Sequence, residues 1–163
     1  MKLFFNDNYQ IENQIRLVFI TKFPQLKSRI LNHFYKYSTK PTSYNFEKVI
    51  FYFLKDTKVF NHVEIKGPYN PYYDILIDNF YKIDLKSTIR NIFLTKHLFI
   101  KTFLVGIYTT SQIKIYLLTP LIQQKYLTNF KNFGFTKYLM FEFTPKITST
   151  LKPISVINFK LFI

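Results

Sequence analysis

Cysteine and alanine are absent from this chain of 163 residues, and glycine occurs only three times. Without cysteine the protein has no disulfide bond, no thiolate metal site and no cysteine nucleophile, which fits a reducing compartment. The three histidines, His33, His62 and His97, are scattered without metal-ligand spacing, so zinc chemistry is not expected. Candidate chemistry therefore has to be sought among the carboxylates and lysines.

Acidic residues are scarce as well, since nine Asp and Glu stand against 23 Lys and Arg. The resulting net charge of +14, with a pI of about 9.8, attracts polyanions. Residues with AT-rich codons are abundant, so mutational bias contributes to the lysine excess, but it does not explain the few acids. We therefore expect nucleic acid as the partner, with DNA favoured over RNA. The lysines expected to include phosphate contacts are Lys96, Lys101, Lys125, Lys131 and Lys137.

Long apolar runs are missing too, and a membrane-spanning helix needs about 20 such residues. The longest candidate, residues 103–118, is interrupted by Gln112 and Lys114 and alternates as a strand does. The apolar start of the chain ends at Asn6, before the core of a signal peptide could form. The sequence therefore predicts an intracellular protein without membrane insertion, and its AT-biased composition indicates a mitochondrial or other organellar setting as one alternative.

Helical spacing of apolar residues is confined to the first third of the chain. It occurs in residues 11–19, 25–37 and 44–54. The first two segments predict a helical extension over residues 1–40, and a polar connector around Pro41 separates it from the main domain at 41–163. The third helix has Glu47 at the border of its apolar stripe.

Farther along, the apolar pattern becomes alternating, which indicates strands. Strands are expected at residues 73–77, 81–86, 103–108, 113–118, 138–143 and 156–163, with a short helix near 121–130. The dipeptide Asp78-Asn79 predicts a tight turn that joins the first two strands as a hairpin. Residues 87–100 fit either a helix or a long loop that ends in a strand. The order of elements predicts an α/β fold with a mixed central sheet flanked by helices.

Three chemically active side chains are expected to meet on this hairpin. Asp74 lies on its first strand, and Asp84 and Lys86 lie two residues apart on its second. Side chains two residues apart on a strand point to the same face, and the turn brings Asp74 across to them. Two carboxylates can hold Mg²⁺ or Mn²⁺, such an ion activates water for attack on a phosphodiester, and a lysine offsets the developing negative charge.

Each of these residues also has a purely structural explanation. Asp74 could hydrogen-bond the turn at residues 69–71, and Asp84 and Lys86 could form a weak ion pair on a solvated strand face. Glu47 could be an exposed acid near the positive end of its helix dipole. Convergence of the carboxylates is required by the catalytic interpretation and not by the structural one.

The spacing of these residues resembles that of the PD-(D/E)XK nuclease superfamily over residues 44–120. The matching runs are Tyr44-Asn-Phe-Glu47, Pro71-Tyr-Tyr-Asp74-Ile-Leu-Ile and Tyr81-Lys-Ile-Asp84-Leu-Lys86. They look most like the small endonucleases associated with group I introns. One departure is that the proline usually found directly before the first acid lies three residues before it here, at Pro71.

The resemblance implies a role for each matching residue. Asp74 and Asp84 would be metal-ligating acids, and the carbonyl oxygen of Leu85 would be a further metal ligand. Lys86 would be the lysine of the motif, and Glu47 the helix acid that supports the catalytic centre. The implied fold is restriction-endonuclease-like, with the N-terminal helical extension added to it.

Two functions fit these observations. The first is a metal-dependent, homing- or restriction-like endonuclease that hydrolyses phosphodiester bonds in DNA, as a homodimer where both strands are cut. The second is a non-catalytic RNA-binding structural protein of an organellar (mitochondrial) ribosome, which the small size, lysine content and AT bias also fit. The set of Asp74, Asp84 and Lys86 favours the first, because a purely structural protein has no chemical need for it.

Overall fold

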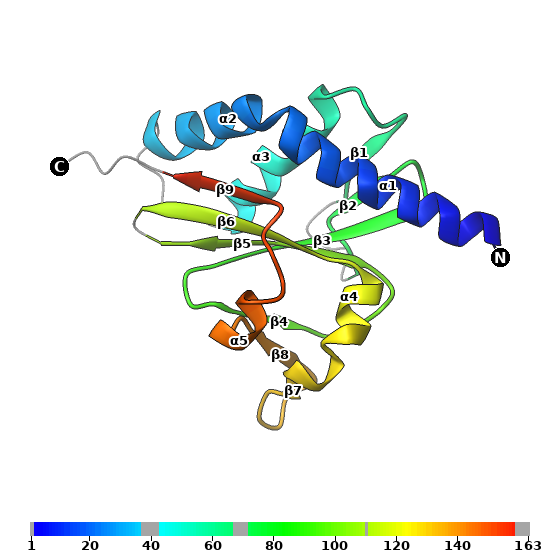
Figure 1. Ribbon diagram of the computed structural model, residues 1–163, viewed down its shortest axis with the longest axis vertical. Helices are drawn as coiled ribbons and strands as arrows, with labels where there is room; N and C mark the ends of the chain where they lie inside the picture. The colour runs from blue at the N-terminus through cyan, green and yellow to red at the C-terminus, as the bar shows by residue number, and fades with distance from the viewer. Residues whose placement is uncertain (1, 37–42, 67–71, 110, 159–163) are drawn as a thin grey trace.

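Three helices come first in the chain and end up on one side of a sheet (Figure 1). The computed structural model describes residues 2–36, 43–66, 72–109 and 111–158, except for the side chains of 2–7, 33–36 and 43–45. The helices are α1 (Lys2–Thr21), α2 (Phe23–Lys36) and α3 (Ser43–Asp56). Pro24 lies in the first turn of α2, where a missing N–H costs no helical hydrogen bond. All three expected helices are thus confirmed, and α1 begins earlier than its apolar spacing indicated.

A mixed six-stranded sheet forms the middle layer. In spatial order it consists of β1 (Val63–Ile65), β2 (Ile75–Ile77), β3 (Tyr81–Thr88), β5 (Thr102–Tyr108), β6 (Gln112–Leu118) and β9 (Ser155–Asn158). β3 and β5 are parallel, and the other neighbouring pairs are antiparallel. Parallel neighbours need a crossover connection, and here the chain between them passes through the layer below the sheet (Figure 1).

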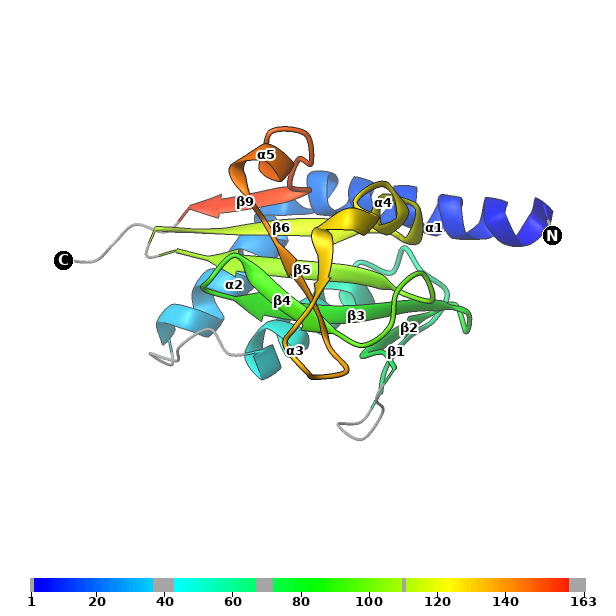
Figure 2. The same ribbon diagram turned by 90° about the horizontal axis from the view of Figure 1, so that it is seen from below.

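That lower layer is a small antiparallel sheet with short helices beside it, and it lies across the main sheet (Figure 2). Its strands, in spatial order, are β4 (Ile92–Thr95), β8 (Leu139–Glu142) and β7 (Phe130–Asn132). The short helices are α4 (Pro120–Lys125), the 3₁₀ turn η1 (Leu127–Asn129) and α5 (Pro145–Thr148). Both α4 and α5 begin with a threonine, Thr119 or Thr144, whose hydroxyl accepts a hydrogen bond from the first turn.

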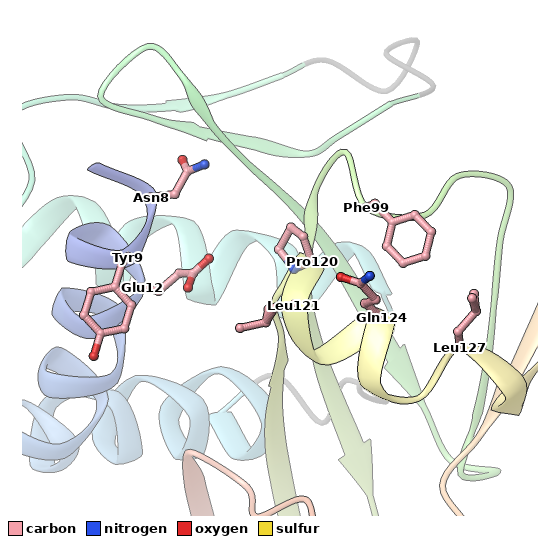
Figure 3. A pocket seen from close by; sticks show the side chains of 8 residues that line it. All are labelled: Asn8, Tyr9, Glu12, Phe99, Pro120, Leu121, Gln124 and Leu127. Atoms are coloured by element: carbon pink, nitrogen blue, oxygen red, sulfur yellow. The ribbon is translucent and has the colours of Figure 1, made fainter. Parts of the chain in front are cut away.

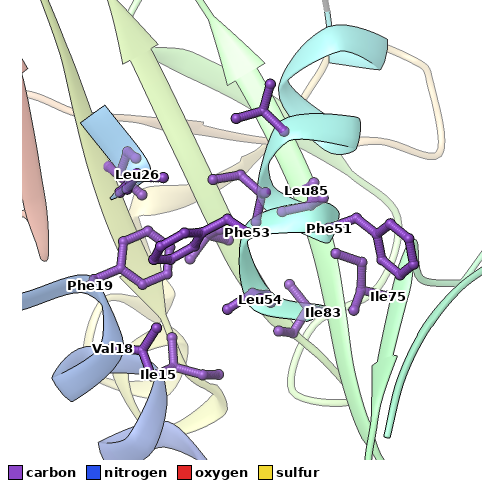
Figure 4. Packing of buried hydrophobic residues seen from close by; sticks show 14 of the residues in the cluster. Ile15, Val18, Phe19, Leu26, Phe51, Phe53, Leu54, Ile75, Ile83 and Leu85 are labelled. Atoms are coloured by element: carbon purple, nitrogen blue, oxygen red, sulfur yellow. The ribbon is translucent and has the colours of Figure 1, made fainter. Parts of the chain in front are cut away.

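Alternate residues of the central strands point into two hydrophobic cores, one on each face of the sheet. On β3, Ile83 and Leu85 pack with the helices in the upper core, where the Phe19 and Phe53 rings meet edge to face at 5.3 Å (Figure 4). On β5, Phe103 and its alternate neighbours belong to the lower core, which is largely aromatic. The central sheet is therefore covered on both faces, which explains why β5 is buried along its whole length.

Gly106 sets the distance between α3 and β5. A Cβ atom at this position would lie 2.8 Å from ring carbons of Phe46, closer than real side chains approach. Because Phe46 is the residue before Glu47, this contact also fixes the position of the Glu47 main chain relative to the sheet. The close packing of α3 on the sheet thus contributes to the position of a predicted site residue.

The predicted hairpin is confirmed, with Asp78 and Asn79 both at positive φ, 51° and 67°, in its turn. Its first strand is shorter than expected and begins at Ile75. Residues 87–100, for which a helix or a long loop ending in a strand was expected, form the end of β3, the strand β4 and a loop. In the lower sheet, β8 confirms the strand expected at residues 138–143, whereas β7 and the pairing of the three strands were not predicted.

Some expectations concern residues outside the described part of the chain. They are the connector around Pro41, the turn at residues 69–71 and the end of the last predicted strand. The division into 1–40 and 41–163 stays a prediction, although buried residues of α1 and α2 belong to the same hydrophobic core as α3 and the sheet. Among the described helices, none combines the length and apolar character that a membrane crossing requires.

Candidate active site

The hairpin brings Asp74 and Asp84 together where β2 begins. Ile75 pairs with Ile83 in the ladder, so the residue before Ile75 lies beside the residue after Ile83. The main-chain N–H of Asp74 donates to the Ile83 carbonyl at 2.9 Å, and its side-chain Oδ2 accepts from the N–H of Leu85 at 2.7 Å. The Asp84 carboxyl group is close enough to contribute to the raised pKa of Asp74. The expected convergence of these two acids is therefore present.

Lys86 lies on the same face of β3 as Asp84, as the two-residue period predicts. Its Nζ is 3.5 Å from Asp84 Oδ2. The Lys86 side chain is 30% exposed and that of Asp84 only 11%. Asp84 is thus not part of a solvated strand face, and the surface-pair explanation does not describe its position.

A second lysine, Lys101, approaches the same carboxylate more closely. Its Nζ lies 2.9 Å from Asp84 Oδ2, and its side chain is only 4% exposed. Lys101 precedes β5, and the parallel register sets Phe103 opposite Asp84, so a side chain two residues before Phe103 shares that face. Lys101 was expected only among the candidate phosphate contacts, because nothing in the sequence shows that β3 and β5 are parallel neighbours.

The main chain at Lys101 is held by the buried amide of Gln123. Gln123 Nε2 donates to the carbonyl oxygens of Lys101 at 2.7 Å and Leu118 at 2.9 Å. Gln123 Oε1 accepts from the N–H of Phe99 at 2.8 Å. The segment before β5 is therefore tied to both α4 and β6, which leaves Lys101 with little freedom at its Cα.

Glu47 approaches the cluster from α3. Its side chain is half-buried, and its pKa is raised first by burial and then by the negative charge of Asp84. Glu47 in turn contributes to the raised pKa of Asp74. Glu47 is therefore within electrostatic reach of both aspartates, and Lys86 belongs to the site through its contact with Asp84.

Burial and crowding of negative charge raise the pKa of Asp74 to about 7. Burial has the largest effect, followed by the hydrogen bond and the charge of Asp84, while the N–H of Leu85 acts in the opposite direction. The cluster therefore favours the protonated form of the Asp74 carboxyl group. With that proton present, the formal charges of Glu47 and Asp84 balance those of Lys86 and Lys101.

The donor atoms at this point suit a hard divalent cation. Besides the two aspartates, the carbonyl of Leu85 is a candidate donor. The N–H and C=O groups of one strand residue point toward the same neighbouring strand, so this carbonyl lies on the same side of β3 as the Leu85 N–H. That side is the one where Asp74 lies. Within the described residues, no group of three or more His, Asp or Glu side chains is arranged to hold a metal ion. The set that fits is therefore two carboxylates and one carbonyl, with Glu47 farther away.

A hollow of about 310 Å³ has Lys82 and Lys101 in its wall, but none of the three acids of the cluster. A larger hollow of about 530 Å³ adjoins it between α1 and α4 (Figure 3). The two hollows share Phe99 and Pro120 in their walls. Lys101 thus contacts Asp84 and also contributes to the wall of the smaller hollow.

Comparisons with known proteins add no relative: no family model matches this chain, and neither a curated protein nor a solved structure matches it. Functional interpretation therefore depends on the geometry of the site itself.

Proposed function

We propose that this protein is a metal-dependent endonuclease that hydrolyses phosphodiester bonds in DNA, with a restriction-endonuclease-like fold. The observation that carries the proposal is the meeting of Asp74, Asp84 and Lys86 on one face of the sheet. Buried carboxyl groups that approach each other are costly unless they serve a cation or a proton. A structural role would not require that cost.

In this proposal Asp74, Asp84 and the Leu85 carbonyl hold Mg²⁺ or Mn²⁺. The bound ion would lower the pKa of a water molecule and offset charge on the phosphate. Lys86, which is partly exposed beside Asp84, would orient the attacking water and stabilise the developing negative charge. Glu47 would add negative charge near the ion from the helix side.

Basic and aromatic side chains outside the cluster would supply a surface for nucleic acid. The Tyr72 ring is centred 5.5 Å from that of His97, and Lys96 Nζ lies 4.9 Å from the centre of the Tyr138 ring. The β7–β8 connection before Tyr138 carries Phe135, whose side chain is fully exposed. Lysines suit phosphate groups and exposed rings suit stacking on bases. Each protomer has one such site, so cutting a duplex would need two copies.

The decisive experiment is cleavage of supercoiled plasmid by the purified chain with Mg²⁺ or Mn²⁺. We expect Asp84→Asn to abolish metal-dependent nicking while it keeps an oxygen for Lys101. Asn is preferred to Ala here, because Ala would leave a buried ammonium unpaired and destabilise the fold. Glu142→Gln, at an exposed acid of β8 outside the cluster, is the matched control and should cleave normally.

Nicking that persists in Asp84→Asn would refute the proposed site. Tight binding of structured RNA with no cleavage, unchanged by Asp84→Asn, would instead favour the second candidate, a non-catalytic RNA-binding protein. The exposed ring of Phe135 and the lysines around it are compatible with that function as well.

A further inference from the structure

We propose that Lys101 is a positioning residue that serves as the resident counter-cation of the site and competes with the divalent ion for Asp84 Oδ2. This inference rests on the proposed function in one respect, since it takes Asp84 as a metal ligand. It concerns a residue outside the motif that first indicated the site, and it makes a prediction about metal affinity that does not depend on cleavage.

The geometry separates Lys101 from Lys86. Both ammonium groups approach the same oxygen, Asp84 Oδ2, but Lys101 is the nearer at 2.9 Å against 3.5 Å. The Lys101 side chain is 4% exposed, whereas that of Lys86 is 30% exposed. Water can therefore solvate Lys86 when Asp84 turns to another cation, but it has little access to Lys101 in the present arrangement.

A buried ammonium group is costly unless a carboxylate pairs with it. The hydrogen bond from Gln123 to the Lys101 carbonyl oxygen fixes the main chain at Lys101. The fold therefore holds the Lys101 ammonium beside Asp84. Without this positive charge, the negative charges of Glu47, Asp74 and Asp84 would face one another with only the more distant Lys86 to offset them. Lys101 therefore keeps the acids together while no metal ion is bound.

The same charge must oppose a metal ion, because an ion held by the Asp84 carboxylate would lie within a few ångströms of the Lys101 ammonium. Binding of the ion requires the Lys101 ammonium to move away from Oδ2. A hollow of about 310 Å³ has Lys101 in its wall, and a flexible four-carbon stem allows the ammonium to turn away from Oδ2. The ammonium is thus exchanged for the metal ion rather than retained beside it.

Isothermal titration calorimetry with MnCl₂, on the full chain without nucleic acid, tests this exchange. We expect Lys101→Met to bind Mn²⁺ about ten- to a hundred-fold more tightly than the wild type, since a like charge a few ångströms away is removed. Lys101→Arg keeps the charge and should stay within about three-fold of the wild type. Lys86→Met is the matched control for loss of a lysine, and we expect a smaller gain because Lys86 is more exposed and better screened.

Equal or weaker Mn²⁺ binding by Lys101→Met would overturn the inference and leave Lys101 as a structural ion-pair partner. Absence of Mn²⁺ binding in both the wild type and Lys101→Met would also overturn it, together with the metal ligation in the proposed function. Tighter binding by Lys101→Met in a protein that never cleaves DNA would support the inference and refute the nuclease. The two failures are therefore distinguishable.

A measurement on the wild type covers the case in which Lys101→Met does not fold. A buried, ion-paired ammonium exchanges its protons slowly, so the Lys101 Nζ resonance should be visible by ¹⁵N-detected nuclear magnetic resonance in metal-free protein. Saturating diamagnetic Mg²⁺ should shift this resonance or remove it through faster exchange. A resonance that stays unchanged while Mg²⁺ saturates the site would refute the exchange.

Discussion

Replacing Asp74 by Asn should stabilise the metal-free protein more strongly at pH 8 than at pH 5. The fold raises the pKa of Asp74 from 3.8 to about 7, so it favours the protonated carboxyl group. In the unfolded chain Asp74 loses its proton as the pH rises through about 4. Between these two values the folded state holds more protons than the unfolded state, and its stability falls as the pH rises. Above pH 7 the full penalty is present.

The size of this penalty follows from the shift. About three pH units correspond to about 4 kcal/mol at 1.36 kcal/mol per unit. Asp74 and Asp84 interact directly, so the penalty belongs partly to the pair, and we expect a gain of about 1–4 kcal/mol for Asp74→Asn at pH 8. Asn cannot ionise, its Oδ1 can still accept from the Leu85 N–H, and its amide can donate to Asp84.

Urea unfolding followed by circular dichroism at pH 5 and pH 8, in EDTA, measures the difference. Glu142→Gln, an acid-to-amide change at an exposed position, serves as the control and should show no such pH-dependent gain. An Asp74→Asn protein that is equally or less stable than the wild type at pH 8 would refute the reasoning. If the proposed metal site is present, Mg²⁺ at pH 8 should stabilise the wild type and leave Asp74→Asn unchanged.

Three further predictions concern packing and the surface. Gly106→Ala should lower the free energy of unfolding by about 1–3 kcal/mol, because its Cβ would lie 2.8 Å from the Phe46 ring; an unchanged urea midpoint would contradict the close packing of α3 on β5. Gln123→Leu should cost about 2–4 kcal/mol in the same assay, because three main-chain groups lose a buried hydrogen bond; full stability would show that residues 99–101 are held by other contacts. Phe135→Ser should weaken DNA binding in fluorescence anisotropy without changing the melting temperature, and wild-type affinity would exclude this ring from the interface.

The hairpin was predictable because its signals are local. The turn residues Asp78 and Asn79 tolerate positive φ, and the alternation around Asp84 fixes which side chains share a face. The convergence with Asp74 followed from these two features alone. Local patterns of this kind need no knowledge of how distant segments meet, which is why the centre of the candidate site was visible in the sequence.

Lys101 was not assigned to the site because its position depends on tertiary pairing. β3 and β5 are separated along the chain by β4 and a loop. No local pattern in residues 87–100 indicates either the crossover or the parallel register. Of the lower sheet only β8 was predicted, as the strand at residues 138–143; strands as short as β4 and β7 show too few alternations to distinguish them from loops. Glu47 is an intermediate case: the helix was predictable, but its approach to Asp84 depends on the contact between Phe46 and Gly106.

The energetics of the cluster bear on the choice between an enzyme and a structural protein. Asp74 lowers the stability of the metal-free fold at neutral pH, and a neutral Asn could make the same main-chain hydrogen bond without that cost. Lys101 is buried against Asp84 at a position where an apolar pair would often be at least as stable. A protein selected only for a stable RNA-binding surface has no use for either feature, whereas a site that must bind and release a cation needs ionisable groups whose charges nearly balance. Local costs that a fold does not need are characteristic of functional sites, and here they fall on the residues that converge at the start of β2.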